Sequence, residues 1–133
     1  MCVLFVCVGN AARSQMAEAL FNHMASGDSI AASVGTRPAD RVSSKAAAAM
    51  DEMGIDISGA KPKPLTAQMV RETDRIITMC GEDSCKFLPE GKPKIERWSI
   101  EDPRGKDLEK VRETRDEIKE RVKQLIEEMK NGR

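Results

Sequence analysis

The chain has 133 residues, which is enough for one compact domain spanning residues 1–133 and too few for two. Lysine and arginine together number 22, as do aspartate and glutamate, so no net positive charge favours nucleic acid or a membrane surface as a partner. No apolar run approaches the roughly 20 residues of a membrane span and the N-terminus does not resemble a signal peptide, so we expect a cytoplasmic protein without a membrane partner.

Strands and helices are predicted to alternate in the first part of the chain. The apolar run 2–7 favours a buried strand, and apolar side chains at helical spacing predict a helix over 13–24. Residues 29–34 favour a second strand. Ser43 is a suitable N-cap for an alanine-rich helix, and Gly54 is suited to end it.

The second part of the chain continues the alternation. Thr66 can cap a short helix, with Leu65 and Val70 spaced as a hydrophobic staple. A strand is predicted over 75–79, a more polar strand near a sheet edge over 94–100, and an amphipathic helix from Leu108 to Met129. The order predicts an α/β fold that is three-layered and doubly wound, with a four-stranded parallel sheet and helices on both faces.

The loop after the first predicted strand has the composition of an anion site. Free backbone N–H groups at a helix N-terminus attract an oxyanion, and they also stabilise the thiolate of a cysteine such as Cys7. The planar guanidinium of Arg13 can grip two oxygens of a tetrahedral anion. The competing interpretation is a buried structural cysteine beside a glycine turn. The candidate oxyanion-binding and loop-supporting residues are Val8, Gly9, Asn10, Ala11, Ala12, Arg13 and Ser14.

The chain has four cysteines, Cys2, Cys7, Cys80 and Cys85, and a reducing compartment favours catalytic, redox or metal roles for them over structural disulfides. A zinc site is disfavoured because Cys2 and Cys7 are an odd number of residues apart and face opposite sides of one strand. We therefore expect no metal, and we expect Cys2 to be a core residue. The single histidine, His23, has no matching ligand or nucleophile near it in the sequence.

The segment CVGNAARS, continuing into QMAEA, and the later pair Asp102-Pro103 together resemble the low-molecular-weight phosphotyrosine phosphatases, and within them the thioredoxin-coupled arsenate reductases. The resemblance implies that Cys7 is the nucleophile, Arg13 binds the oxyanion and Asp102 is the general acid. It also implies that Asn10 braces the loop and that Ser14 hydrogen-bonds the thiolate. Many relatives carry a second cysteine at the position of Ala12, and we expect its loss to leave the main chemistry intact.

Two further cysteines distinguish a reductase from a phosphatase. Hydrolysis of a phosphoenzyme needs one cysteine and water, whereas reduction of arsenate needs two electrons, which successive thiols can supply. The resemblance implies that Cys80 attacks Cys7 as arsenite leaves and that Cys85 then attacks Cys80. The polar stretch containing Gly81 suits a segment that rearranges on oxidation.

The expected function is therefore an arsenate reductase that is recycled by thioredoxin or a similar dithiol protein. We expect a monomer with no tightly bound cofactor, an external dithiol reductant, and arsenate or a phosphate-like oxyanion as ligand. The alternative is a low-molecular-weight phosphatase acting through a cysteinyl phosphate. The chain has no tyrosine, which disfavours a site with aromatic walls for an aryl phosphate. The single tryptophan, Trp98, could either shield the pocket or pack in the core.

Overall fold

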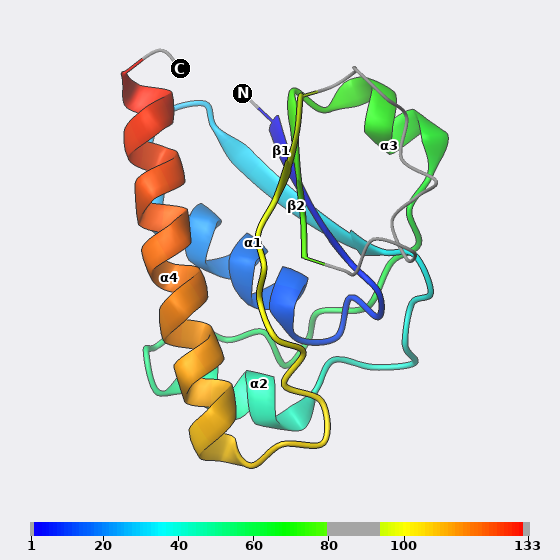
Figure 1. Ribbon diagram of the computed structural model, residues 1–133, viewed down its shortest axis with the longest axis vertical. Helices are drawn as coiled ribbons and strands as arrows, with labels where there is room; N and C mark the ends of the chain where they lie inside the picture. The colour runs from blue at the N-terminus through cyan, green and yellow to red at the C-terminus, as the bar shows by residue number, and fades with distance from the viewer. Residues whose placement is uncertain (1, 80–93, 132–133) are drawn as a thin grey trace.

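A computed structural model describes residues 2–79 and 94–131 (Figure 1). Its four strands form one sheet in the order β2-β1-β3-β4, and each neighbouring pair is parallel. The strands are β1 (Cys2–Cys7), β2 (Ile30–Gly35), β3 (Arg75–Thr78) and β4 (Lys94–Arg97). The helices are α1 (Arg13–Met24), α2 (Ser44–Asp51), α3 (Ala67–Glu72) and α4 (Leu108–Lys130).

Helices cover both faces of the sheet, which confirms the three-layer, doubly wound prediction (Figure 1). On one face, α1, α2 and α4 pack with alternate β1 residues such as Val3 and Phe5 into the larger core. On the other face, Val70 of α3 packs with Leu4, Val6 and other apolar side chains in a smaller core. This division follows from the strand period of two, which sends successive β1 side chains to opposite faces.

The predicted local signals act as capping groups. Ser43 Oγ accepts a hydrogen bond from the Ala46 amide, and Thr66 Oγ1 accepts one from the Met69 amide. Gly54 follows α2 with a φ of 77°, the left-handed conformation that glycine adopts without a steric cost. Three strands differ from expectation at their ends: β2 spans Ile30–Gly35 and not 29–34, β3 ends at Thr78 and not at 79, and β4 ends at Arg97 and not at 100.

Three single residues noted in the sequence now have clear positions. Trp98 is 2% exposed and its ring centroid lies 5.6 Å from that of Phe5, so Trp98 is a core residue and the pocket-shield interpretation is wrong. Cys2 is half-buried at the start of β1, less enclosed than the core position expected for it. His23 is exposed near the end of α1.

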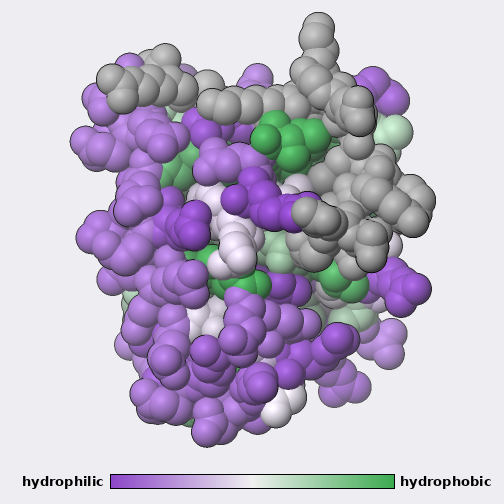
Figure 2. Space-filling view, viewed as in Figure 1, coloured by the Kyte–Doolittle hydropathy of each residue, from purple (hydrophilic) through white to green (hydrophobic). Residues whose placement is uncertain are grey.

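The described part of the surface facing the viewer in Figure 2 is mostly hydrophilic, with isolated apolar positions. Charged side chains of α4 dominate its left side (Figures 1 and 2). None of the helices within residues 2–79 and 94–131 combines the length and the apolar character needed to cross a membrane.

Candidate active site

The candidate nucleophile Cys7 ends β1, and the loop that follows curls over its side chain. Cys7 is 2% exposed, and its Sγ accepts a hydrogen bond from the Asn10 amide at 3.2 Å. The Ser14 hydroxyl lies 2.8 Å from the same sulfur. Helix α1 starts at Arg13 without a side-chain cap at Ala12, so no capping side chain competes for the amides at the start of the helix.

The loop backbone is fixed from outside by the segment 36–43. Four of the carbonyl groups of residues 7–11 accept hydrogen bonds from backbone amides of that segment. In a trans peptide the C=O and the next N–H point in opposite directions. Holding these carbonyls outward therefore turns the following amides inward, toward the sulfur and any oxyanion beside it. The four bonds are Thr36 N to Cys7 O, Arg37 N to Val8 O, Ala39 N to Gly9 O and Ser43 N to Ala11 O, with lengths of 3.1, 2.8, 2.9 and 2.9 Å.

The close approach of β2 to this loop requires Gly35. A Cβ on Gly35 would lie 2.6 Å from Val8 O, closer than real Cβ contacts, and 3.0 Å from the Asn10 amide nitrogen, which is tighter than most of them. The Gly35 amide and carbonyl also bond to Lys63 and Leu65, which holds the strand end in place. The sequence analysis did not single out Gly35, since a glycine at a strand end carries no chemical signature.

Asn10 organises the buried polar groups beneath the loop. It has a φ of 52°, in the left-handed region that asparagine tolerates better than most residues. Its Oδ1 accepts from the Lys63 amide at 2.9 Å, which fixes the orientation of the side-chain amide because a backbone N–H can only donate. Asn10 Nδ2 therefore donates to Ser14 Oγ at 2.7 Å and to Ser33 Oγ at 2.9 Å.

The hydrogen bonds from Asn10 define the direction in which the Ser14 and Ser33 hydroxyl groups donate. Since Ser14 Oγ accepts from Asn10, its own hydrogen is free to donate to the Cys7 sulfur. Ser33 likewise donates to Glu18 Oε1 at 2.7 Å. The roles implied for Asn10 and Ser14 thus correspond to real contacts, whereas the supports Ser33 and Lys63 have no signal in the sequence because they come from distant segments.

Arg13 is 7% exposed and is held at the carboxyl end of the sheet. Its Nη1 donates to the carbonyl of Met79, directly after β3, and to the carbonyl of Ile100 at 3.0 Å. Its Nη2 lies 3.7 Å from Asp102 Oδ2. The two carbonyls fix the guanidinium without neutralising it, and only the Asp102 carboxylate, at 3.7 Å, offsets part of the charge that Arg13 presents to an anion beside Cys7.

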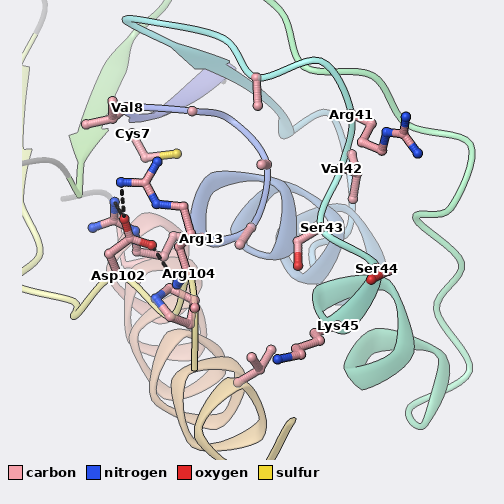
Figure 3. Close-up of a pocket in the computed structure, with 17 residues that line it drawn as sticks. Cys7, Val8, Arg13, Arg41, Val42, Ser43, Ser44, Lys45, Asp102 and Arg104 are labelled. Atoms are coloured by element: carbon pink, nitrogen blue, oxygen red, sulfur yellow. Dashed lines mark hydrogen bonds and ion pairs between the residues drawn. The ribbon is translucent and has the colours of Figure 1, made fainter. Parts of the chain in front are cut away.

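Asp102 lies in the loop between β4 and α4. Its Oδ1 accepts from the Arg104 amide at 2.9 Å, and Arg104 Nη2 lies 3.7 Å from Oδ2. The following Pro103 is buried. The carboxylate is half-buried beside Arg13, where a proton donor can face a bound oxyanion (Figure 3).

A cavity of about 460 Å³ opens in front of Cys7 (Figure 3). Its walls come from the loop after β1, the segment 39–45, the residues 102–105 and Val111 of α4. No aromatic side chain is among the described residues that line it. The cavity brings together Cys7, Arg13 and Asp102, which are distant in sequence.

The other two predicted redox residues, Cys80 and Cys85, lie outside the described residues. Met79 is the last residue described before Cys80, and its amide donates to Val6 O at 2.8 Å. Within residues 2–79 and 94–131, no group of three histidine, cysteine, aspartate or glutamate side chains is arranged to hold a metal ion.

Comparison with known proteins finds one protein family and relatives that match most of the chain. The profile described as "Low molecular weight phosphotyrosine protein phosphatase" matches residues 2–133. A glutaredoxin arsenate reductase from Synechocystis sp. is 39% identical over 126 residues, covering 93% of this chain and 95% of the relative.

Two solved structures extend the comparison. An arsenate reductase from Archaeoglobus fulgidus has a TM-score of 0.77 and 47% identity, covering 93% of this chain and 98% of that one. A thioredoxin-dependent arsenate reductase from Corynebacterium glutamicum has a TM-score of 0.83 and 36% identity, covering 99% of this chain and 63% of that one.

Proposed function

The chain belongs to the low molecular weight phosphotyrosine protein phosphatase family, and we propose that it is an arsenate reductase recycled by an external dithiol protein. The observation that carries the proposal is the fixed position of Met79. Its amide bonds to Val6 and its carbonyl to Arg13, so the residue just before Cys80 is anchored beside the strand that ends in Cys7. A phosphatase needs only one cysteine, whereas in this sequence a second cysteine, Cys80, directly follows Met79.

The first step uses the groups around Cys7. The inward-facing loop amides and Arg13 bind arsenate, and the Cys7 thiolate, stabilised by Asn10 and Ser14, attacks the arsenic. A sulfur–arsenic bond forms and an arsenic–oxygen bond breaks. Asp102 protonates the departing oxygen, which leaves as water.

The next steps transfer the electrons. The Cys80 thiolate attacks Cys7 Sγ, the sulfur–arsenic bond breaks, and its electron pair stays on arsenic, which leaves as arsenite. The product is a Cys7–Cys80 disulfide. Cys85 then attacks Cys80, which frees Cys7 and leaves a Cys80–Cys85 disulfide for the external dithiol protein to reduce. The thioredoxin-dependent and glutaredoxin names of two relatives support a reductant of this class.

Phosphate ester hydrolysis is the second candidate activity, because the same loop can hold a phosphoryl group on Cys7 until water releases it. The cavity geometry supports this as a side activity. The lack of aromatic lining residues argues against an aryl phosphate as the main substrate.

The deciding experiment compares two reactions in one protein. We expect Cys80→Ser and Cys85→Ser to abolish thioredoxin-coupled arsenate reduction while hydrolysis of 4-nitrophenyl phosphate continues. Cys80→Ser should stop at the arsenic adduct, and Cys85→Ser should accumulate the Cys7–Cys80 disulfide, both visible by mass spectrometry. Cys2→Ser is the matched control, since Cys2 lies at the opposite end of β1 from the loop. Parent rates of arsenate reduction in both Cys80→Ser and Cys85→Ser would remove the relay and favour the phosphatase.

A further inference from the structure

We propose that the outer part of the cavity is a second anion subsite, formed by Lys45 and Arg104, that selects phosphate monoesters whose organic group carries a carboxylate. This inference deepens the proposed side activity and depends on the proposed oxyanion site at Cys7. The second subsite would recognise the organic group of the ligand, whereas the loop after β1 recognises only its tetrahedral anion.

The cavity is larger than an inorganic oxyanion requires. A water molecule has a share of roughly 30 Å³ in the liquid, so an inorganic oxyanion replaces only a few waters. The cavity has about 460 Å³, within the range of sites that hold organic ligands. Space for an organic group therefore remains after the loop is filled.

The described residues that line the cavity carry an excess of positive charge. Among the described lining residues, only Asp102 is acidic, whereas four are cationic, namely Arg13, Arg41, Lys45 and Arg104. The whole chain has a formal charge of zero, so this imbalance is local. A site lined by one sign of charge concentrates ligands of the opposite sign and repels cationic leaving groups.

Lys45 is the most specific feature of this wall. It projects from the first turn of α2, and its Nζ donates to Lys106 O at 2.6 Å (Figure 3). The neutral carbonyl holds the ammonium group in place without cancelling its charge. No carboxylate in the described parts of the chain forms an ion pair with Lys45.

Arg104 provides the second cation from the loop that carries Asp102 (Figure 3). Its side chain is 85% exposed, and its Nη2 lies 3.7 Å from Asp102 Oδ2. Asp102 Oδ2 lies equally near Arg13 Nη2, so one carboxylate is shared by two guanidinium groups. Asp102 therefore neutralises only part of the positive charge of Arg13 and Arg104, and the remainder can attract an anionic ligand.

The test uses two aryl phosphates of nearly equal shape, 4-carboxyphenyl phosphate and its neutral counterpart 4-carbamoylphenyl phosphate. The measured quantity is the ratio of their kcat/KM values. Because their leaving groups differ chemically, only the change in this ratio between protein variants is interpreted. Hydrolysis proceeds by attack of Cys7 on phosphorus, loss of the phenol with a proton from Asp102, and release of phosphate by water.

Lys45→Gln removes the charge but keeps a donor that can approach Lys106. We expect it to lower the carboxyl-to-carbamoyl ratio about two- to fivefold, the effect of one exposed charge pair. Lys45→Gln combined with Arg104→Gln should lower the ratio further, and 0.5 M salt should reduce the parent's preference. Lys45→Arg should keep the ratio, and so should Lys123→Gln, which removes an exposed lysine of α4 that does not line the cavity.

An unchanged ratio in the double variant overturns the second subsite. The same comparison is made by binding, as the protection of Cys7 from iodoacetamide by each phosphate, so that slow turnover does not hide the result. If neither inorganic phosphate nor either ester protects Cys7, the oxyanion site of the proposed function has failed. Equal protection by both esters in the parent protein, with protection by phosphate retained, contradicts the second subsite alone.

Discussion

The Arg13 guanidinium lies 3.7 Å from the Asp102 carboxylate, although the two residues are almost ninety positions apart in the chain. The contact links the group proposed to bind the oxyanion with the group proposed to protonate its departing oxygen. Both residues line the cavity in front of Cys7. The proposed proton donor therefore lies at the same site as the proposed nucleophile.

Asp102→Asn tests the role of this carboxylate. We expect kcat to fall about 100-fold or more, because the amide cannot donate the proton to the leaving oxygen. Inhibition by phosphate should stay the same or become tighter, since Arg13 loses its negatively charged neighbour. Steady-state kinetics with a phosphate titration measure both effects, and an unchanged kcat would exclude Asp102 as general acid.

Ser14→Ala tests the hydroxyl that faces the Cys7 sulfur at 2.8 Å. A hydrogen bond to a charged group contributes about 1.5–3 kcal/mol, so we expect turnover to fall about 10- to 100-fold. Ser44→Ala is the control, because Ser44 is an exposed serine lining the same cavity. If both variants lose activity equally, the Ser14 contact has no special role.

Gly35→Ala tests the packing of β2 against the loop. The new Cβ would meet Val8 O at 2.6 Å, so either the strand or the loop must move. We expect a loss of about 1–3 kcal/mol in the free energy of unfolding and weaker binding of phosphate. Gly59→Ala is the matched control, since no atom lies within 4 Å of its added Cβ. Urea unfolding and phosphate protection of Cys7 measure the two effects; equal behaviour of the variants would contradict the packing argument.

Glu52 provides a prediction about pH. Hydrogen bonds from Arg112 and then Arg115 of α4 lower the pKa of Glu52 from 4.5 to about 2. Because the folded-state pKa is lower than the unfolded one, this pairing stabilises the fold above about pH 4.5, and the stabilisation is lost as pH falls toward 2.

Replacing Glu52 should change how steeply the free energy of unfolding depends on pH. Glu52→Gln should lower the free energy of unfolding at pH 7 and flatten its decline between pH 4.5 and 2. The measurement is urea unfolding at a series of pH values. Glu113→Gln on α4 is the control, and a Glu52→Gln curve parallel to the parent curve would show that the pairing does not contribute.

Local signals predicted the elements well, because they depend on neighbouring residues. The Ser43 and Thr66 caps and the left-handed Gly54 follow from side-chain chemistry within one helical turn. Contacts between segments that are distant in the sequence could not be predicted in this way. Trp98 could be assigned to pocket or core only after the sheet had brought it against Phe5.

The α/β alternation and the proposed anion-binding character of the loop from Cys7 to Ser14 could be predicted from the sequence, since each depends on contiguous residues. The contacts that keep this loop in shape could be seen only in the folded chain. They are the hydrogen bonds from the backbone amides of 36–43, the close approach allowed by the missing Cβ of Gly35, and the Asn10 contacts with Ser33 and Lys63. The reason is physical. Backbone N–H groups are alike in nearly all residues, so their partners are set by where the folded chain brings them and not by which side chains they carry.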